Sequence, residues 1–116
     1  MTIQEKVSII GGGNMGDALV RGLIQTKTLS PKQLLIAEPR KERKKAFLQK
    51  YNLSVTNDNR VAARSGEIII LAIKPQIMKE VLEEIYSEVT SKQLIISIAA
   101  GISIAFIVSY LGEDRR

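Results

Sequence analysis

The chain of 116 residues contains neither cysteine nor histidine. Without cysteine it can form no disulfide, no thiolate metal site and no cysteine nucleophile. Without histidine it lacks the commonest general base and metal ligand, which argues against most hydrolase chemistry. We therefore expect no metal centre. Both absences fit a reducing environment, and we expect a cytoplasmic protein.

Long apolar runs are also missing. No stretch approaches the roughly 20 apolar residues that span a bilayer, and the N-terminus lacks the sections of a signal peptide, so we expect no membrane partner. The five aromatic residues do not alternate with basic side chains as a base-stacking platform requires. The net charge of +5 therefore indicates an anionic small molecule rather than a nucleic acid.

Apolar runs alternate with segments of helical periodicity along the whole chain. This alternation predicts an α/β fold, a doubly wound parallel sheet of Rossmann type with strand order 3-2-1-4-5, in one domain over residues 1–116. We expect strands near 6–10, 34–37, 54–56, 68–73 and 94–98. We expect helices near 14–26, 41–51 and 59–64, a fourth carrying Ile77, Val81, Leu82 and Ile85, and a fifth from 103 to about 111.

Two of these helices have predicted buried faces. The first is expected to bury Met15, Leu19, Gly22 and Leu23, and the second Phe47, Leu48 and Tyr51.

A glycine-rich turn follows the first predicted strand directly. It has the spacing G-x-G-x-x-G and precedes a predicted helix. The first glycine permits a tight turn, the second lets a pyrophosphate approach the backbone, and the third lets the helix pack closely on the strand. The phosphates would bind at the N-terminal end of that helix. The predicted cofactor contacts here are Gly11, Gly12, Gly13, Asn14, Met15 and Gly16.

The residues after the second predicted strand carry opposite charges. Glu38 lies 22 positions after Gly16, close to the spacing of an acid that binds a ribose 2′-hydroxyl. Arg40 and Lys41 instead suit a 2′-phosphate, which a carboxylate would repel. An inward Glu38 favours NAD, and a Glu38 that turns away favours NADP on Arg40. A third possibility is that Glu38 simply faces solvent.

Small and basic residues follow the fourth and fifth predicted strands. Ala72 would let a ribose or nicotinamide ring come close, Lys74 could contact a phosphate, and Pro75 suits the first turn of a helix. Residues 99–101 offer small side chains where a flat ring could lie; they are Ala99, Ala100 and Gly101. No nucleophile–base pair is visible, so we assign no catalytic residue. Hydride transfer needs none, because the cofactor carries the chemistry.

Three motifs together resemble pyrroline-5-carboxylate reductase in order and spacing. They are residues 9–16 (IIGGGNMG), 72–76 (AIKPQ) and 97–102 (SIAAGI), and the resemblance covers the whole chain. It implies reduction of the imine 1-pyrroline-5-carboxylate to L-proline in proline biosynthesis, with NADP(H) favoured over NAD(H). It also places Asn59 against the cofactor. Members of this family carry a helical C-terminal domain that forms the oligomer and much of the imine pocket. We expect that domain to be absent from this chain.

Other readings of the same residues stay open. The chain could be the cofactor domain of another reductase, such as a coenzyme F420-dependent NADP oxidoreductase or a β-hydroxyacid dehydrogenase. It could also be a nucleotide-sensing module without chemistry of its own. If the chain is a reductase domain, we expect it to bind the cofactor and to turn over substrate poorly or not at all.

Overall fold

The computed structural model describes residues 4–98. Strands and helices alternate along this part of the chain, as predicted. The strands are β1 (Val7–Ile10), β2 (Leu34–Ala37), β3 (Ser54–Thr56), β4 (Ile68–Leu71) and β5 (Leu94–Ser97). The helices are α1 (Asn14–Gln25), α2 (Lys41–Tyr51), α3 (Asn59–Ser65) and α4 (Pro75–Ile85), with a 3-10 turn η1 (Pro31–Gln33) before β2.

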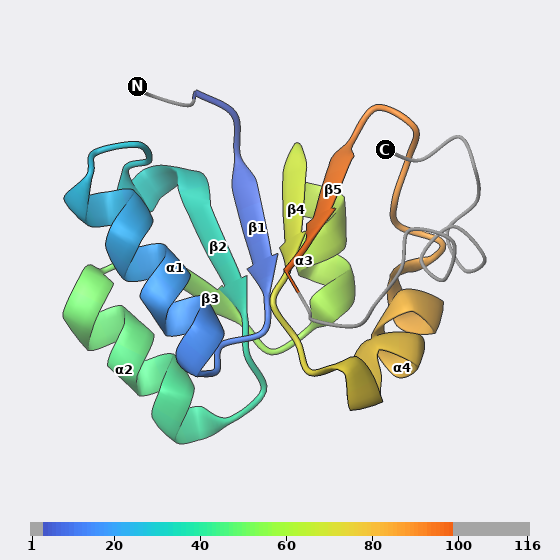
Figure 1. The fold of residues 1–116 in the computed structure, drawn as a ribbon, viewed down its shortest axis with the longest axis horizontal. Coiled ribbons are helices and arrows are strands. Elements are labelled where there is room, and N and C mark those ends of the chain that lie inside the picture. Colours follow the sequence, from blue (N-terminus) through green and yellow to red (C-terminus); the bar gives the residue numbers. More distant parts are fainter. Residues whose placement is uncertain (1–3, 99–116) are drawn as a thin grey trace.

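The five strands form one parallel sheet in the predicted order β3-β2-β1-β4-β5. The central strand β1 pairs with both β2 and β4, so that Ile9 lies between Ile36 and Ile70. Because all strands run in the same direction, their carboxyl ends meet at one edge of the sheet (Figure 1). The strand order reverses on either side of β1, which is where ligands bind in sheets of this kind.

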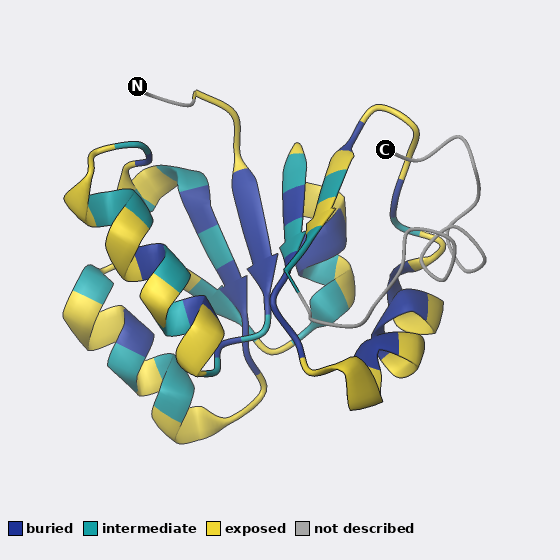
Figure 2. Cartoon of the chain, in the orientation of Figure 1, coloured by how far each residue is buried: buried dark blue, intermediate teal, exposed yellow. Residues whose placement is uncertain are grey.

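The helices cover the two faces of the sheet with separate hydrophobic cores. On one face, Val20 of α1 and Phe47 of α2 pack against Ile9 and Ile36. On the other face, Ala62 of α3 and the buried side of α4 pack against a second cluster. The strand β1 is buried along its whole length (Figure 2) because it has helices on both faces.

Local chemistry sets the ends of these helices. The Asp58 side chain accepts a hydrogen bond from the Arg60 amide at 2.9 Å and caps the start of α3. Asn52 adopts the left-handed conformation, with φ of 55°, and ends α2. Pro75 occupies the first turn of α4, where its missing N–H costs no hydrogen bond, as expected from the sequence.

Several predictions about buried residues were wrong. Met15 and Leu48 are each 50% exposed, and Gly22 is exposed, because the buried stripe of α1 runs through Gly16 and Val20 instead. Ile77 is 42% exposed and faces a cavity rather than the core.

Strand and helix ends also differ from prediction. The fourth strand ends at Leu71 instead of residue 73, since the chain turns toward α4 there. The predicted fifth helix lies outside the described residues.

The edge strand β5 is covered less completely than the rest of the sheet. Leu94 and Ile96 are exposed beside half-buried Ile68 and Ile70 of β4 (Figure 2). The buried Gln93 side chain holds the start of this strand by donating to the carbonyls of Ala63 and Gly66. Within residues 4–98, no helix is long and apolar enough to cross a membrane.

Candidate functional site

A cavity of about 300 Å³ opens at the carboxyl edge of the sheet, where the topology places a ligand. Its walls come from the ends of β1, β2 and β4, the glycine turn, the start of α3 and the first two turns of α4. The lining residues are Ile10, Gly11, Gly12, Gly13, Ala37, Glu38, Pro39, Arg40, Asn59, Ala72, Ile73, Lys74, Ile77 and Val81.

The glycine turn needs glycine at two positions for separate reasons. Gly11 has a φ of +114°, and a side chain there would also collide with the carbonyl of Ala72. Gly16 lies on α1 directly against the carbonyl of Gly11, so an added Cβ would push the helix away from the turn. This close approach places the N-terminal end of α1 beside the cavity.

Backbone amides at the start of α1 are available to a ligand. The first helical hydrogen bond runs from the Asp17 amide to the Gly13 carbonyl at 2.9 Å, so the amides of residues 13–16 precede the hydrogen-bond ladder. Within residues 4–98, no side chain caps this end. Four free N–H groups and the positive end of the helix dipole form a binding site for an anion such as a pyrophosphate.

The nearest acidic side chain on α1 is directed away from these amides. Asp17 accepts a hydrogen bond from the Tyr51 hydroxyl at 2.8 Å and pairs with Lys50 at 3.6 Å. Its negative charge is therefore directed toward α2, where it does not oppose an anion at the helix start.

Glu38 points inward, and its side chain is only 2% exposed. One carboxylate oxygen, Oε1, accepts from the Gly12 amide at 3.1 Å and from Arg40 Nη2 at 2.9 Å. The other oxygen, Oε2, accepts from the Arg40 amide at 2.7 Å and from Arg40 Nε at 3.0 Å. The possibility that Glu38 simply faces solvent was therefore wrong.

The ionised form of Glu38 is stabilised by these donors. Burial by itself would raise the pKa of the carboxyl group, but hydrogen bonds from the Arg40 side chain and backbone, the Arg40 charge and the Gly12 amide together outweigh it. The pKa of Glu38 is thereby held below its usual value. The same contacts raise the pKa of Arg40.

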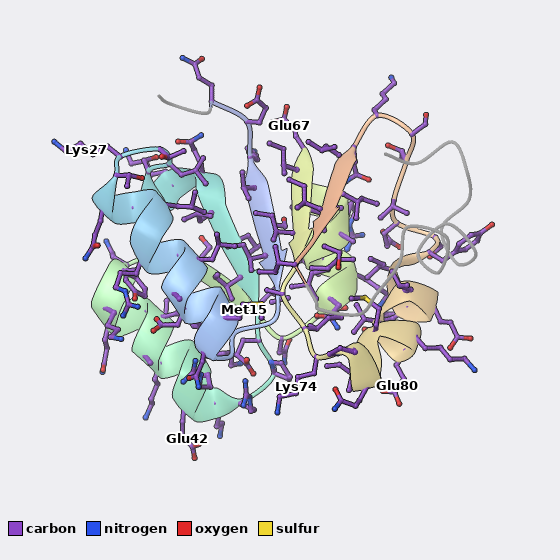
Figure 3. All side chains as sticks on the ribbon, in the orientation of Figure 1. Met15, Lys27, Glu42, Glu67, Lys74 and Glu80 are labelled. Atoms are coloured by element: carbon purple, nitrogen blue, oxygen red, sulfur yellow. The ribbon has the colours of Figure 1, made fainter. Side chains whose placement is uncertain are left out.

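Two further cations border the cavity region. Arg43 of α2 donates from Nε to the Gly12 carbonyl at 2.8 Å and so supports the glycine turn from the outside. Lys74 lines the cavity at the N-terminal end of α4, at the carboxyl edge of the sheet (Figure 3). In the part of the chain that the structure describes, no ion pair involves Lys74.

The apolar wall of the cavity was not predicted from the sequence. It consists of Ile73, Ile77 and Val81, which we had assigned to a strand or to the core face of a helix. Ile77 and Val81 lie about one turn apart on α4, and their apolar spacing is the same for a cavity wall as for a core face. Asn59, which also lines the cavity, donates from Nδ2 to Glu84 Oε1 of α4 at 2.7 Å.

The cavity brings together half of the predicted contact residues. Those that line it are Gly11, Gly12, Gly13, Glu38, Arg40, Asn59, Ala72 and Lys74. Asn14, Met15, Gly16, Pro75 and Lys41 lie close by in the chain but do not line the cavity; the first three begin α1. Ala99, Ala100 and Gly101 lie outside the described residues.

Fold and site together define a dinucleotide-binding domain of the doubly wound class. The chain belongs to the family described as NADP oxidoreductase, coenzyme F420-dependent, whose pattern matches residues 6–101.

Sequence similarity over nearly the whole of this chain is to pyrroline-5-carboxylate reductases, as the three sequence motifs predicted. The chain is 36% identical over 112 residues to the enzyme of Methanosarcina acetivorans, covering 97% of this chain and 42% of that protein. The crystal structure of the Coxiella burnetii enzyme matches with a TM-score of 0.88 at 33% identity, over 98% of this chain and 42% of its own.

The Plasmodium falciparum reductase with NADP bound matches with a TM-score of 0.84 at 28% identity, over 99% of this chain and 41% of its own. The chain thus spans about two fifths of the length of its relatives.

Proposed function

We propose that this chain is the cofactor-binding domain of a reductase that converts 1-pyrroline-5-carboxylate to L-proline with NAD(P)H, and that NADP(H) is its preferred cofactor. The observation that carries the proposal is the set of free amides at residues 13–16 beside a cavity of about 300 Å³, in a chain aligned over nearly its full length with pyrroline-5-carboxylate reductases. The relative with NADP bound supports the choice of cofactor.

The cofactor is assigned to the cavity in three parts. The pyrophosphate binds the amides of residues 13–16 at the start of α1. The adenosine half lies toward Glu38, Arg40 and Asn59, along the apolar wall of Ile77 and Val81. The nicotinamide half lies toward the small residue Ala72 and the residues that follow β4 and β5; these are Lys74, Pro75, Ala99, Ala100 and Gly101.

The protein residues in this proposal bind and orient rather than react. The reduced nicotinamide, when bound, supplies a hydride from C4 to the imine carbon, while a proton is added to the imine nitrogen. Gly11 and Gly16 bring the backbone close enough for the pyrophosphate to fix the position of the ring. Lys74 adds a positive charge near the phosphates.

The remainder of the enzyme is assigned to sequence beyond this domain. Because the chain spans about two fifths of its relatives, we propose that a helical C-terminal domain supplies most of the imine pocket, the proton donor and the contacts of a homo-oligomer. The substrate is a small molecule, neither a membrane nor a nucleic acid is a partner, and the enzyme works in the cytoplasm.

The proposal is tested by calorimetric titration of this chain with NADPH and with NADH, together with an assay of proline formation. We expect NADPH to bind more tightly than NADH, and we expect no proline from the chain alone. A protein that binds neither nucleotide at millimolar concentration would contradict the cofactor assignment. Proline formation by this chain would contradict the assignment of the substrate pocket to a further domain.

A second candidate is a reductase that exchanges hydride between NADP and coenzyme F420. The description of the matching family favours it, although the relatives aligned here are pyrroline-5-carboxylate reductases. An assay of a longer protein containing this domain, with each substrate in turn, distinguishes the two. Oxidation of NADPH that depends on F420 rather than on the imine would favour the second candidate.

A further inference from the structure

The Glu38 carboxylate has no vacant acceptor position. A carboxylate offers about four lone-pair sites. In this structure Oε1 accepts two N–H groups, from Gly12 and Arg40, and Oε2 accepts two more, both from Arg40. A ribose 2′-hydroxyl that approached Glu38 would have to displace one of these four donors. Three of the four belong to the positively charged residue Arg40. The usual role of an acid after the second strand is therefore already blocked here.

Arg40, in contrast, has donors to spare. Its guanidinium carries five N–H groups, and two of them form the bidentate contact with Glu38. The Arg40 side chain is 60% exposed, while Glu38 is 2% exposed. The planar group therefore uses one edge to bind the buried carboxylate and turns its other edge outward, next to the cavity that it lines.

The surrounding charge favours an anion in spite of Glu38. Residues 38–45 contain five basic and two acidic side chains, for a net charge of +3. Glu38 and Arg40 neutralise one another at contact distance, so the remaining basic side chains at the start of α2 determine the local potential. A phosphate would meet a positive field and a fixed, outward guanidinium edge.

We infer that Glu38 is a positioning residue for Arg40, and that this pair selects a cofactor with a 2′-phosphate. Glu38 does not accept the ribose hydroxyl. It holds the Arg40 guanidinium by a bidentate contact and also anchors the Gly12 amide, so that the phosphate contact and the pyrophosphate turn are fixed together. The inference rests on the proposed function, since it assumes that the cavity binds a dinucleotide. It reconciles an inward Glu38 with a preference for NADP(H).

The test compares the affinities of NADPH and NADH for five variants of this chain. Glu38→Gln keeps the shape but removes the charge and replaces one acceptor oxygen with a donor, so that Arg40 is released. We expect NADPH affinity to fall about tenfold and NADH affinity to change less than twofold. Arg40→Gln should have the same effect. The double variant should lose no more of the preference for NADPH over NADH than Arg40→Gln alone, because Glu38 affects the 2′-phosphate contact only through Arg40.

Glu42→Gln is the matched control. It removes one negative charge from the same helix start, but Glu42 makes no contact with Arg40 beyond long-range attraction. We expect it to leave the affinities for both nucleotides within twofold. Arg40→Lys is a second probe that avoids a buried change: it keeps the charge and loses the bidentate geometry. It should therefore lower NADPH affinity several-fold and spare NADH.

Three outcomes would overturn the inference. Glu38→Gln could strengthen NADPH binding and weaken NADH binding, which would make Glu38 the ribose acceptor. It could leave both affinities unchanged, or lower both equally as a general loss of folding would. If Glu38→Gln does not fold, Arg40→Lys still decides, because equal losses for both nucleotides would exclude selection at the 2′ position. A wild-type chain that binds neither nucleotide would instead refute the proposed function.

Discussion

Two cavities of nearly equal size lie at opposite ends of the sheet and differ in chemistry. The one at the carboxyl edge has a volume of about 300 Å³, and the one where α1 passes into β2 has about 310 Å³. Figure 3 shows their surroundings far apart, with Met15 and Lys74 at the carboxyl edge and Lys27 at the other end. Volume therefore does not distinguish a binding site from a surface hollow in this protein.

The difference lies in which backbone groups are already bonded. At the second cavity, the Lys27 amide donates to the Ile24 carbonyl and the Thr28 amide to the Leu23 carbonyl at the end of α1. The Ser30 amide donates to the Gln33 side chain. At the carboxyl edge, the amides of residues 13–16 have no such partners in the described part of the chain. The backbone groups at the two ends of a helix have no partners within the helix. Of the two ends of α1, only the start leaves such groups available to a ligand in the described part of the chain.

The largest effect is expected from Gly16→Ala, which would close the carboxyl-edge site. An added Cβ would overlap the Gly11 carbonyl, so α1 would have to move away from the glycine turn. We expect a loss of about 1–3 kcal/mol in the free energy of unfolding and of at least tenfold in NADPH affinity. Urea denaturation and calorimetry measure the two.

Gly22→Ala is the matched control on the same helix. Among the described residues, no atom beyond the adjoining part of α1 itself lies within 4 Å of its added Cβ, and alanine favours helix, so the unfolding free energy should rise by about 0.5–1 kcal/mol. Equal losses from both variants would show that α1 tolerates no alanine, and that the close approach at Gly16 is not the cause.

A smaller effect is expected from Arg43→Gln, which removes a support of the same site from outside the cavity. The Arg43 contact with the Gly12 carbonyl holds the turn in place, and its loss should lower NADPH affinity roughly fivefold. The control is Lys45→Gln, an exposed residue of the same helix with the same charge, which should change affinity less than twofold. Equal effects of the two variants would assign the loss to net charge alone.

The smallest effect is expected at the second cavity, from Lys27→Gly. Lys27 has a φ of 59° at the end of α1, in the left-handed conformation that glycine adopts without strain. The change should raise the unfolding free energy by about 0.5–1 kcal/mol and leave NADPH affinity unaltered. Thermal denaturation with and without NADPH checks both statements. A change in affinity would mean that the two ends of the sheet are coupled.

Much of the fold was predictable because periodicity depends on local sequence. The ranges of β2, α2 and β3 match their predictions residue for residue, and the strand order follows from the alternation of strands and helices. The exposed positions Met15 and Leu48 were missed because apolar spacing shows which face a helix could bury, and only the packing of α1 and α2 shows how wide that face is.

The sequence by itself determined where a ligand could bind, since the glycine turn and the parallel strands place their ends at one edge. It also identified Glu38 and Arg40 as the residues after β2 that could contact the ribose of the cofactor. Only the tertiary structure decided how they share the site. From the sequence, the Glu38 carboxylate and the Arg40 guanidinium were alternative contacts for the ribose of the cofactor. Folding instead buries the carboxylate, bonds it to Gly12 and leaves the guanidinium half exposed. Hydrogen-bond saturation is a property of geometry in three dimensions, and spacing along a chain does not encode it.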